Sequence, residues 1–196
     1  LFGDIWFEGE LCIAFADTNV GKSILAVVMS HQISSGQNII SSLNTEVRPS
    51  KVFYFDFEMS DKQFQVRYSD ENGENGFGFN DNFNRLEFDS DAEIPKKMTY
   101  EEAIINSIEV TIQVDEPEIV IIDNITFLSA DNEKGKGALA LMKELQRIKK
   151  KYDVSMLVLA HTPKRDFSRP LTKNDLAGSK MLMNFCDSCF AIGESC

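Results

Sequence analysis

The sequence contains no hydrophobic run of the roughly 18 apolar residues that a membrane-spanning helix requires. It also lacks the basic-then-apolar N-terminal segment of a secretory signal peptide. Cysteine is scarce: Cys12, Cys186, Cys189 and Cys196 fit no disulfide framework, and Cys186-x-x-Cys189 lacks the second pair that a zinc site needs. We therefore expect no membrane partner and a reducing, cytoplasmic location.

Basic residues are also in deficit, because 20 Lys and Arg stand against 31 Asp and Glu and give a formal net charge of −11. This balance disfavours indiscriminate nucleic-acid binding, since affinity for phosphates comes from Lys and Arg. Much of the excess lies in residues 69–93, where eight acidic residues accompany the single basic Arg85. We expect this acidic excursion to be an exposed hairpin or mobile loop, either simply solvated or a functional acidic patch.

The 196 residues, 43% of them apolar, are enough for one domain with a substantial core, residues 1–196. Apolar runs predict strands over 10–15, 52–57, 118–122, 155–160 and 188–192. Periodic segments predict helices over 22–34, 60–68, 99–114 and 138–151, the second and third of them opened by capping boxes. This alternation predicts an α/β fold with a mostly parallel central sheet and a site at the carboxyl ends of its strands. The start at Leu1 and the end at Cys196, just after a predicted strand, suggest a fragment of a longer chain.

Residues 16–23 read Ala-Asp-Thr-Asn-Val-Gly-Lys-Ser and lie between the first predicted strand and the first predicted helix. Strand, Gly-Lys-Ser loop and helix together are the layout of a phosphate-binding P-loop, in which backbone N–H groups converge on a phosphate chain. Lys22 is expected to reach the β- and γ-phosphates, and the Ser23 hydroxyl to bind Mg²⁺. The usual first glycine is replaced by Ala16. The predicted ATP-binding residues are Ala16, Asp17, Thr18, Asn19, Val20, Gly21, Lys22, Ser23 and Ile24.

Asp123 ends a run of four apolar residues, as the metal-positioning aspartate of a Walker B motif does. With a P-loop about a hundred residues upstream, this predicts that Asp123 and Ser23 hold Mg²⁺ together. The alternative is a strand-end aspartate that caps the following turn.

Glu58 and His161 are the remaining catalytic candidates, together with Lys22. Glu58 follows a strand that we expect to lie beside the P-loop strand, where a carboxylate could accept a proton from an attacking water. Asp56 points to the same side of that strand and competes for this role, and either acid could instead be solvated or mark a helix entry. His161 ends the 155–160 strand and could contact the γ-phosphate, or be a structural histidine.

The order of these motifs resembles that of RecA-like P-loop ATPases, more closely the hexameric DnaB-type helicase and plasmid RepA-type branch. The resemblance rests on Gly9-Glu10-Leu11, the P-loop, Phe57-Glu58-Met59-Ser60, Ile121-Ile122-Asp123, Ala160-His161-Thr162, and Asp175-Leu176-Ala177-Gly178-Ser179 followed by Asp187. It implies a three-layer core and favours Glu58 over Asp56 as the catalytic acid. It also implies that His161 senses the γ-phosphate. The trans-acting Arg or Lys fingers of that branch would lie beyond Cys196.

The resemblance implies an ATP-binding, Mg²⁺-dependent ATPase that works on DNA as a hexamer-like homo-oligomer, with DNA contacted by residues 129–137 and 162–177. Residues 164–180 carry a net charge of +3, which fits contact with nucleic-acid phosphates, contact with a neighbouring subunit's ATP, or a solvated loop. The acidic balance favours a different class, a nucleotide-gated regulatory or assembly module. A P-loop kinase for a small molecule is a third reading, weakened by the lack of an evident Arg-rich lid.

Overall fold

The computed structural model describes residues 1–41, 43–46, 48–70, 76–89, 91–125, 136–162, 171–176 and 182–193. The strands are β1 (Leu11–Ala16), β2 (Val52–Asp56), β3 (Phe83–Glu87), β4 (Ile119–Asp123), β5 (Ser155–His161) and β6 (Ser188–Ile192). The helices are α1 (Lys22–Ser35), α2 (Asp61–Arg67), α3 (Tyr100–Asp115), α4 (Lys136–Tyr152) and a short 3₁₀ helix, η2 (Lys173–Asp175).

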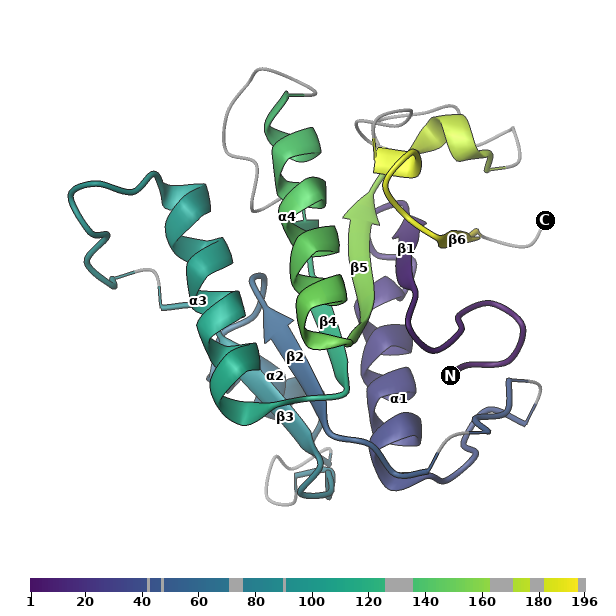
Figure 1. Ribbon diagram of the computed structural model, residues 1–196. Coiled ribbons are helices and arrows are strands. Elements are labelled where there is room, and N and C mark those ends of the chain that lie inside the picture. The colour runs from purple at the N-terminus through teal and green to yellow at the C-terminus, as the bar shows by residue number, and fades with distance from the viewer. Residues whose placement is uncertain are drawn as a thin grey trace.

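The strands form one sheet in the order β3-β2-β4-β5-β1-β6, and every pairing between neighbours is parallel (Figure 1). The predicted α/β fold with a parallel sheet is therefore confirmed. One expected neighbour relation is wrong, because β2 does not lie beside the P-loop strand β1. Strands β4 and β5 lie between them, so any link between Glu58 and the P-loop must cross the ends of these two strands.

Two apolar cores lie on opposite faces of the sheet, because successive strand residues point to opposite sides. On one face, Ile13 and Ile122 pack with α3 and α4 through residues such as Ile108 and Leu145. On the other face, strand residues such as Ala14, Tyr54 and Ile121 pack with α1 and with the N-terminal residues Phe2 and Trp6. The result is the three-layer architecture of RecA-like P-loop folds, in which the central strands are buried on both faces.

The two predicted capping boxes begin their helices as expected. Ser60 accepts from the backbone N–H of Gln63, whose side chain accepts from the Ser60 N–H, and Thr99 and Glu102 are paired in the same way. Each pair satisfies two backbone N–H groups that a helix start would otherwise leave unpaired. Helix α4 starts at Lys136, two residues before its predicted start, so part of the expected 129–137 loop is helical.

The acidic excursion at 69–93 is not only an exposed hairpin or loop, because residues 83–87 form β3, an edge strand of the sheet. β3 pairs with β2 in register from Val52↔Phe83 to Asp56↔Glu87. A hairpin-like contact does occur nearby, as an antiparallel bridge between Ser69 and Gly76. This segment therefore contributes a structural element beside the strand that leads to Glu58.

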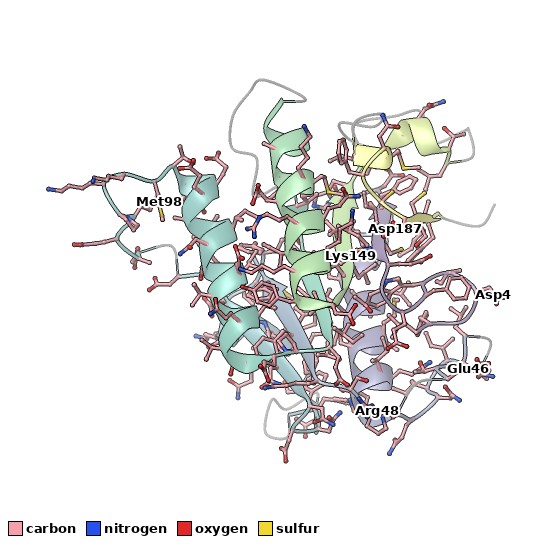
Figure 2. All side chains as sticks on the ribbon, viewed as in Figure 1. Asp4, Glu46, Arg48, Met98, Lys149 and Asp187 are labelled. Carbon is pink, nitrogen blue, oxygen red and sulfur yellow. The ribbon has the colours of Figure 1, made fainter. Side chains whose placement is uncertain are left out.

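Asp187 joins the strand pair β1–β6 to helix α4. Its carboxylate accepts hydrogen bonds from the backbone N–H of Leu11 at 2.8 Å and from Lys149 Nζ at 2.6 Å. Figure 2 shows Lys149 and Asp187 next to one another at this junction. Among the helices that the structure describes, none is long and apolar enough to cross a membrane.

Candidate active site

The P-loop follows β1 directly. Ala16 is the last residue of that strand, and its carbonyl accepts the N–H of Thr162 at 3.1 Å. Ala16 is not among the residues with positive φ, so its place in the loop does not require glycine. Positive φ occurs instead at Asn19 (66°) and at Gly21 (91°), the N-cap of α1. A Cβ atom at Gly21 would meet nothing within 4 Å, so glycine is needed there for its backbone angle and not for space.

Lys22 begins α1 and is buried, with its Nζ 3.2 Å from Nδ1 of His161 at the end of β5. Burial lowers the pKa of Lys22, and the nearby carboxylates of Asp123 and Glu58 partly oppose that shift. The P-loop lysine is thus directed at the site beyond the strand ends, where phosphates would lie.

His161 connects Lys22 to Glu58. Its Nε2 lies 2.9 Å from Oε1 of Glu58, and Asn124 Nδ2 donates to the same oxygen. Asn124 Nδ2 also lies 2.9 Å from Nε2. A lysine ammonium can only donate, so its contact with Nδ1 favours the tautomer in which Nδ1 accepts and Nε2 carries the proton toward Glu58. The hydrogen bond from His161 is the main reason that the pKa of Glu58 is lowered, and burial opposes it. Glu58 is therefore an ionised acceptor held by two neighbours.

Asp123 ends β4 and is fully buried, with Tyr54 Oη donating to its Oδ2 at 2.6 Å. Burial raises the pKa of Asp123, while hydrogen bonding by Tyr54 and by Ser23 lowers it. Within the described part of the chain, Oδ1 of Asp123 has no hydrogen-bond partner of normal geometry. A buried carboxylate oxygen with no donor at normal hydrogen-bond geometry, and with a serine hydroxyl nearby, fits a hard cation such as Mg²⁺. Ser23 and Asp123 would hold it.

Asp56 is engaged away from this group. Its Oδ2 forms an ion pair with Arg85 Nε at 2.9 Å, and its Oδ1 accepts the N–H groups of Glu58 and Met59. The Asp56 carboxylate is occupied by these donors, and its hydrogen bonds hold the backbone of the segment that carries Glu58. Of the two competing acids, only Glu58 reaches the group formed with Lys22 and His161.

The two segments expected to contact DNA are described only in part. Residues 129–135, 163–170 and 177 lie outside the described residues, as do the basic residues Lys164, Arg165, Arg169 and Lys180. Lys136 and Gly137 belong to helix α4. Thr172 and Asp175 form a capping box on η2, so this part of the expected loop is helical as well. Contact with DNA stays a prediction.

Three residues that join this site are missing from the sequence prediction. Asn124 follows Asp123 directly, and its position at a strand end was the available signal. Tyr54 reads as an ordinary core aromatic of a strand, so its contact with Asp123 gives no sequence signal. Arg85 stands out only as the single base of an acidic stretch, which is typical of a solvated segment.

Comparison with known families finds that a family model described as an AAA domain matches residues 1–166, which include the P-loop, Glu58, Asp123 and His161. A search of curated proteins finds no match. The matched range includes β1 to β5 and stops before β6.

Proposed function

Because the chain belongs to the AAA domain family, and is a nucleotide-binding ATPase domain in that general sense, we propose that it hydrolyses ATP with Mg²⁺ and couples hydrolysis to DNA binding or unwinding in a hexamer-like homo-oligomer. The observation that carries the ATPase proposal is the connection from Lys22 through His161 to Glu58. It joins the phosphate-binding loop to a carboxylate that can accept a proton. The coupling to DNA rests on the resemblance to DnaB-type and RepA-type helicases.

Each residue has a defined task in this proposal. Lys22 and the N–H groups of residues 16–24 bind the phosphates, and Ser23 with Asp123 holds Mg²⁺, which neutralises phosphate charge. Glu58 orients the attacking water and accepts its proton, a role that suits a carboxylate kept ionised by its neighbours.

His161 makes the proton acceptor responsive to the phosphates. One ring nitrogen of His161 lies 3.2 Å from Lys22 Nζ, and the other lies 2.9 Å from Oε1 of Glu58. When Lys22 contacts a bound phosphate, it loses its contact with His161. The His161 ring, which also contacts Glu58, is then free to reorient. Phosphate binding at the P-loop is thereby transmitted to the carboxylate of Glu58, which follows β2, two strands away from β5 in the sheet.

The alternative is a nucleotide-gated regulatory or assembly module that binds ATP without acting on DNA. The net charge of −11 favours it, because an acidic surface repels a phosphate backbone. The two proposals share the nucleotide site and differ only in what responds to it.

ATP turnover by the full-length protein tests the common part. We expect Lys22→Ala to lose both ATP binding and turnover. Glu58→Gln should keep ATP binding and lose about 10²-fold to 10⁴-fold in kcat, because only proton acceptance is removed. Turnover that survives Lys22→Ala would disprove the P-loop assignment.

Single-stranded DNA separates the two proposals. Under the helicase-like proposal, DNA raises kcat, and the stimulation declines steeply with salt because phosphate contacts release counterions. Turnover that ignores DNA at every salt concentration, in a protein with Lys22-dependent activity, would favour the regulatory module.

A further inference from the structure

We propose that Asp56 and Arg85 are a pair of positioning residues that fix the turn carrying Glu58 and so set the rate of hydrolysis. This inference rests on the proposed ATPase function, because it assigns to Glu58 the role of proton acceptor. It gives the acidic excursion a task, since Arg85 is its single basic residue and lies on the edge strand β3.

The turn between β2 and α2 is fixed through its backbone. Phe57 donates its N–H to the carbonyl of Asp123 at 2.7 Å, and Glu58 and Met59 donate to Oδ1 of Asp56 at 3.0 and 2.9 Å. The two following N–H groups, of Ser60 and Asp61, bind Oε1 of Gln63 and Oε2 of Glu87. Five consecutive amides are thus satisfied, two of them by one carboxylate, so Asp56 decides the local course of the chain around Glu58.

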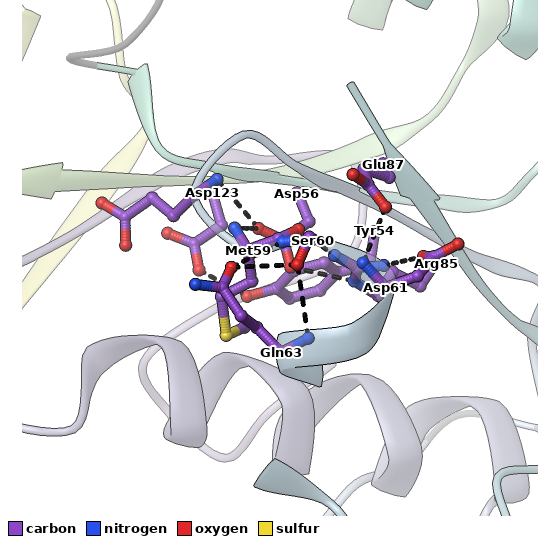
Figure 3. Close-up of polar contacts among 10 residues, drawn as sticks. Tyr54, Asp56, Met59, Ser60, Asp61, Gln63, Arg85, Glu87 and Asp123 are labelled. Atoms are coloured by element: carbon purple, nitrogen blue, oxygen red, sulfur yellow. Dashed lines mark hydrogen bonds and ion pairs between the residues drawn. The ribbon is translucent and has the colours of Figure 1, made fainter. Parts of the chain in front are cut away.

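Arg85 holds Asp56 and the far side of the same turn (Figure 3). Its Nε donates to Oδ2 of Asp56 at 2.9 Å, while its two terminal nitrogens donate to the carbonyl of Met59 and to Oδ1 of Asp61. The guanidinium also lies over the ring of Phe64, 4.6 Å from its centroid. The planar, five-donor guanidinium can serve these partners together, whereas a lysine ammonium cannot.

The Asp56–Arg85 pair is buried, so the loss of one partner is costly. The side chain of Arg85 is 8% exposed and that of Asp56 is fully buried. Removal of Arg85 leaves the buried Asp56 carboxylate without its ion-pair partner, and removal of the Asp56 charge leaves Arg85 with the exposed Asp61 as its acidic partner, so the turn is expected to rearrange. Lys22 and Ser23 lie on α1 and Asp123 lies on β4, outside this turn. Loss of the pair should therefore displace Glu58 and leave the nucleotide-binding residues in place.

The test combines hydrogen–deuterium exchange of the amides of residues 57–61 with steady-state ATP turnover, in the full-length protein. Arg85→Met removes the guanidinium, and Arg85→Lys keeps the positive charge but not the planar set of donors. Asp56→Asn keeps the shape of the acceptor but not its charge. Arg147→Met is the matched control. It makes the same substitution at an arginine outside the turn and breaks the ion pairs of Arg147 with Glu109 on α3 and Glu144 on α4.

We expect exchange at 57–61 to accelerate about 10-fold or more in Arg85→Met, and kcat to fall about 10-fold to 100-fold with KM for ATP within about 3-fold of wild type. Arg85→Lys and Asp56→Asn should show the same pattern at intermediate size, and they decide the matter if Arg85→Met does not fold. Arg147→Met should change neither quantity.

Unchanged exchange at 57–61, or a kcat no lower than that of Arg147→Met, would overturn the inference. Failure of the proposed function looks different. In that case wild type shows no Lys22-dependent turnover, and the catalytic half of the inference falls with it. The exchange rates then still decide whether Arg85 and Asp56 fix the turn.

Discussion

At the scale of single residues, Asp123 combines a structural cost with a proposed function. Its pKa is raised mainly by burial, so its ionised form is disfavoured in the folded protein relative to the unfolded chain. For a carboxyl group with a raised pKa, the favourable contribution is present at low pH and is lost as pH rises through the folded-state pKa. At neutral pH the charge therefore weakens the ligand-free fold, and a bound cation would relieve that cost.

We therefore expect Asp123→Asn to melt at the same temperature as wild type or up to roughly 3 °C higher, at pH 7 without nucleotide or Mg²⁺. Mg²⁺ with ATP should raise the melting temperature of wild type and have a much smaller effect on the variant. Thermal unfolding with and without the ligands measures both effects. Asp81→Asn, at an exposed position, is the control. A ligand-free variant that melts clearly below wild type would contradict this account of Asp123.

At the scale of elements, α2 depends on its capping box more than α3 does. None of the seven residues of α2 is buried, in a stretch that the structure describes completely, whereas α3 buries Ile104, Ile105, Ile108 and Ile112. Helices gain most of their stability from packing, so a short helix that packs on the core through the half-buried Phe64 relies more on its N-cap. That N-cap, Ser60, lies two residues after Glu58.

Ser60→Ala and Thr99→Ala remove the same kind of cap, and each is expected to cost about 1 kcal/mol of local or global stability. Helix α3 should remain folded because its isoleucines stay packed, whereas α2 should fray at its first turn. We therefore expect Ser60→Ala to lower ATP turnover several-fold and Thr99→Ala to leave it unchanged. Denaturant unfolding and turnover assays on the two variants check this. Equal turnover would show that α2 does not support the Glu58 turn.

The same elements show what could be predicted from the sequence. Ser60 and Thr99 mark their helices correctly because a capping box is a local pattern, and buried parallel strands such as β4 appear as continuous apolar runs. β3 is missed because its five residues, Phe-Asn-Arg-Leu-Glu, lie at the sheet edge and are half-buried or exposed within an acidic stretch. Residues 83–87 form a strand because they pair with β2, and this interaction is not local in the sequence.

The candidate site follows the same division. Lys22, Ser23, Glu58, Asp123 and His161 can be proposed from sequence because each belongs to a motif or ends a strand. Their mutual contacts depend on the strand order, and the expectation that β2 lies beside β1 was wrong. The partners that orient them, Asn124, Tyr54 and Arg85, are recognisable only once that order is known.

At the scale of the whole molecule, the layer formed by α3 and α4 is joined across its outer side by Glu109. This carboxylate accepts from Arg147 Nη1 and from Lys151 Nζ, both at 2.9 Å. Hydrogen bonds from Arg147 and then Lys151 lower the pKa of Glu109 to about 2. A lowered carboxyl pKa stabilises the fold above the ordinary value of 4.5, and that contribution is lost as pH falls toward about 2.

Glu109→Gln should therefore lower the free energy of unfolding by about 1 kcal/mol at pH 7, a modest amount because the partners are partly exposed and solvent screens them. The difference from wild type should shrink as pH is lowered from about 5 to about 3. Urea unfolding over this range measures it, with the exposed Glu93→Gln as control. A difference that stays constant or grows on acidification would show that packing, and not charge, is the source.

The strand order has a consequence for how the site can change. Glu58 and the P-loop follow β2 and β1, while Asp123 and His161 are the last residues of β4 and β5, so the site spans the ends of four adjacent strands. Parallel strands lie about 4.8 Å apart, so the span from β2 to β1 is about 14 Å, and backbone hydrogen bonds fix it. No substitution in a loop can alter that span. The sequences of loops that contact a partner can therefore vary freely. The side chains of Lys22 and His161, in contrast, must keep the lengths that bridge the fixed distance between the strands.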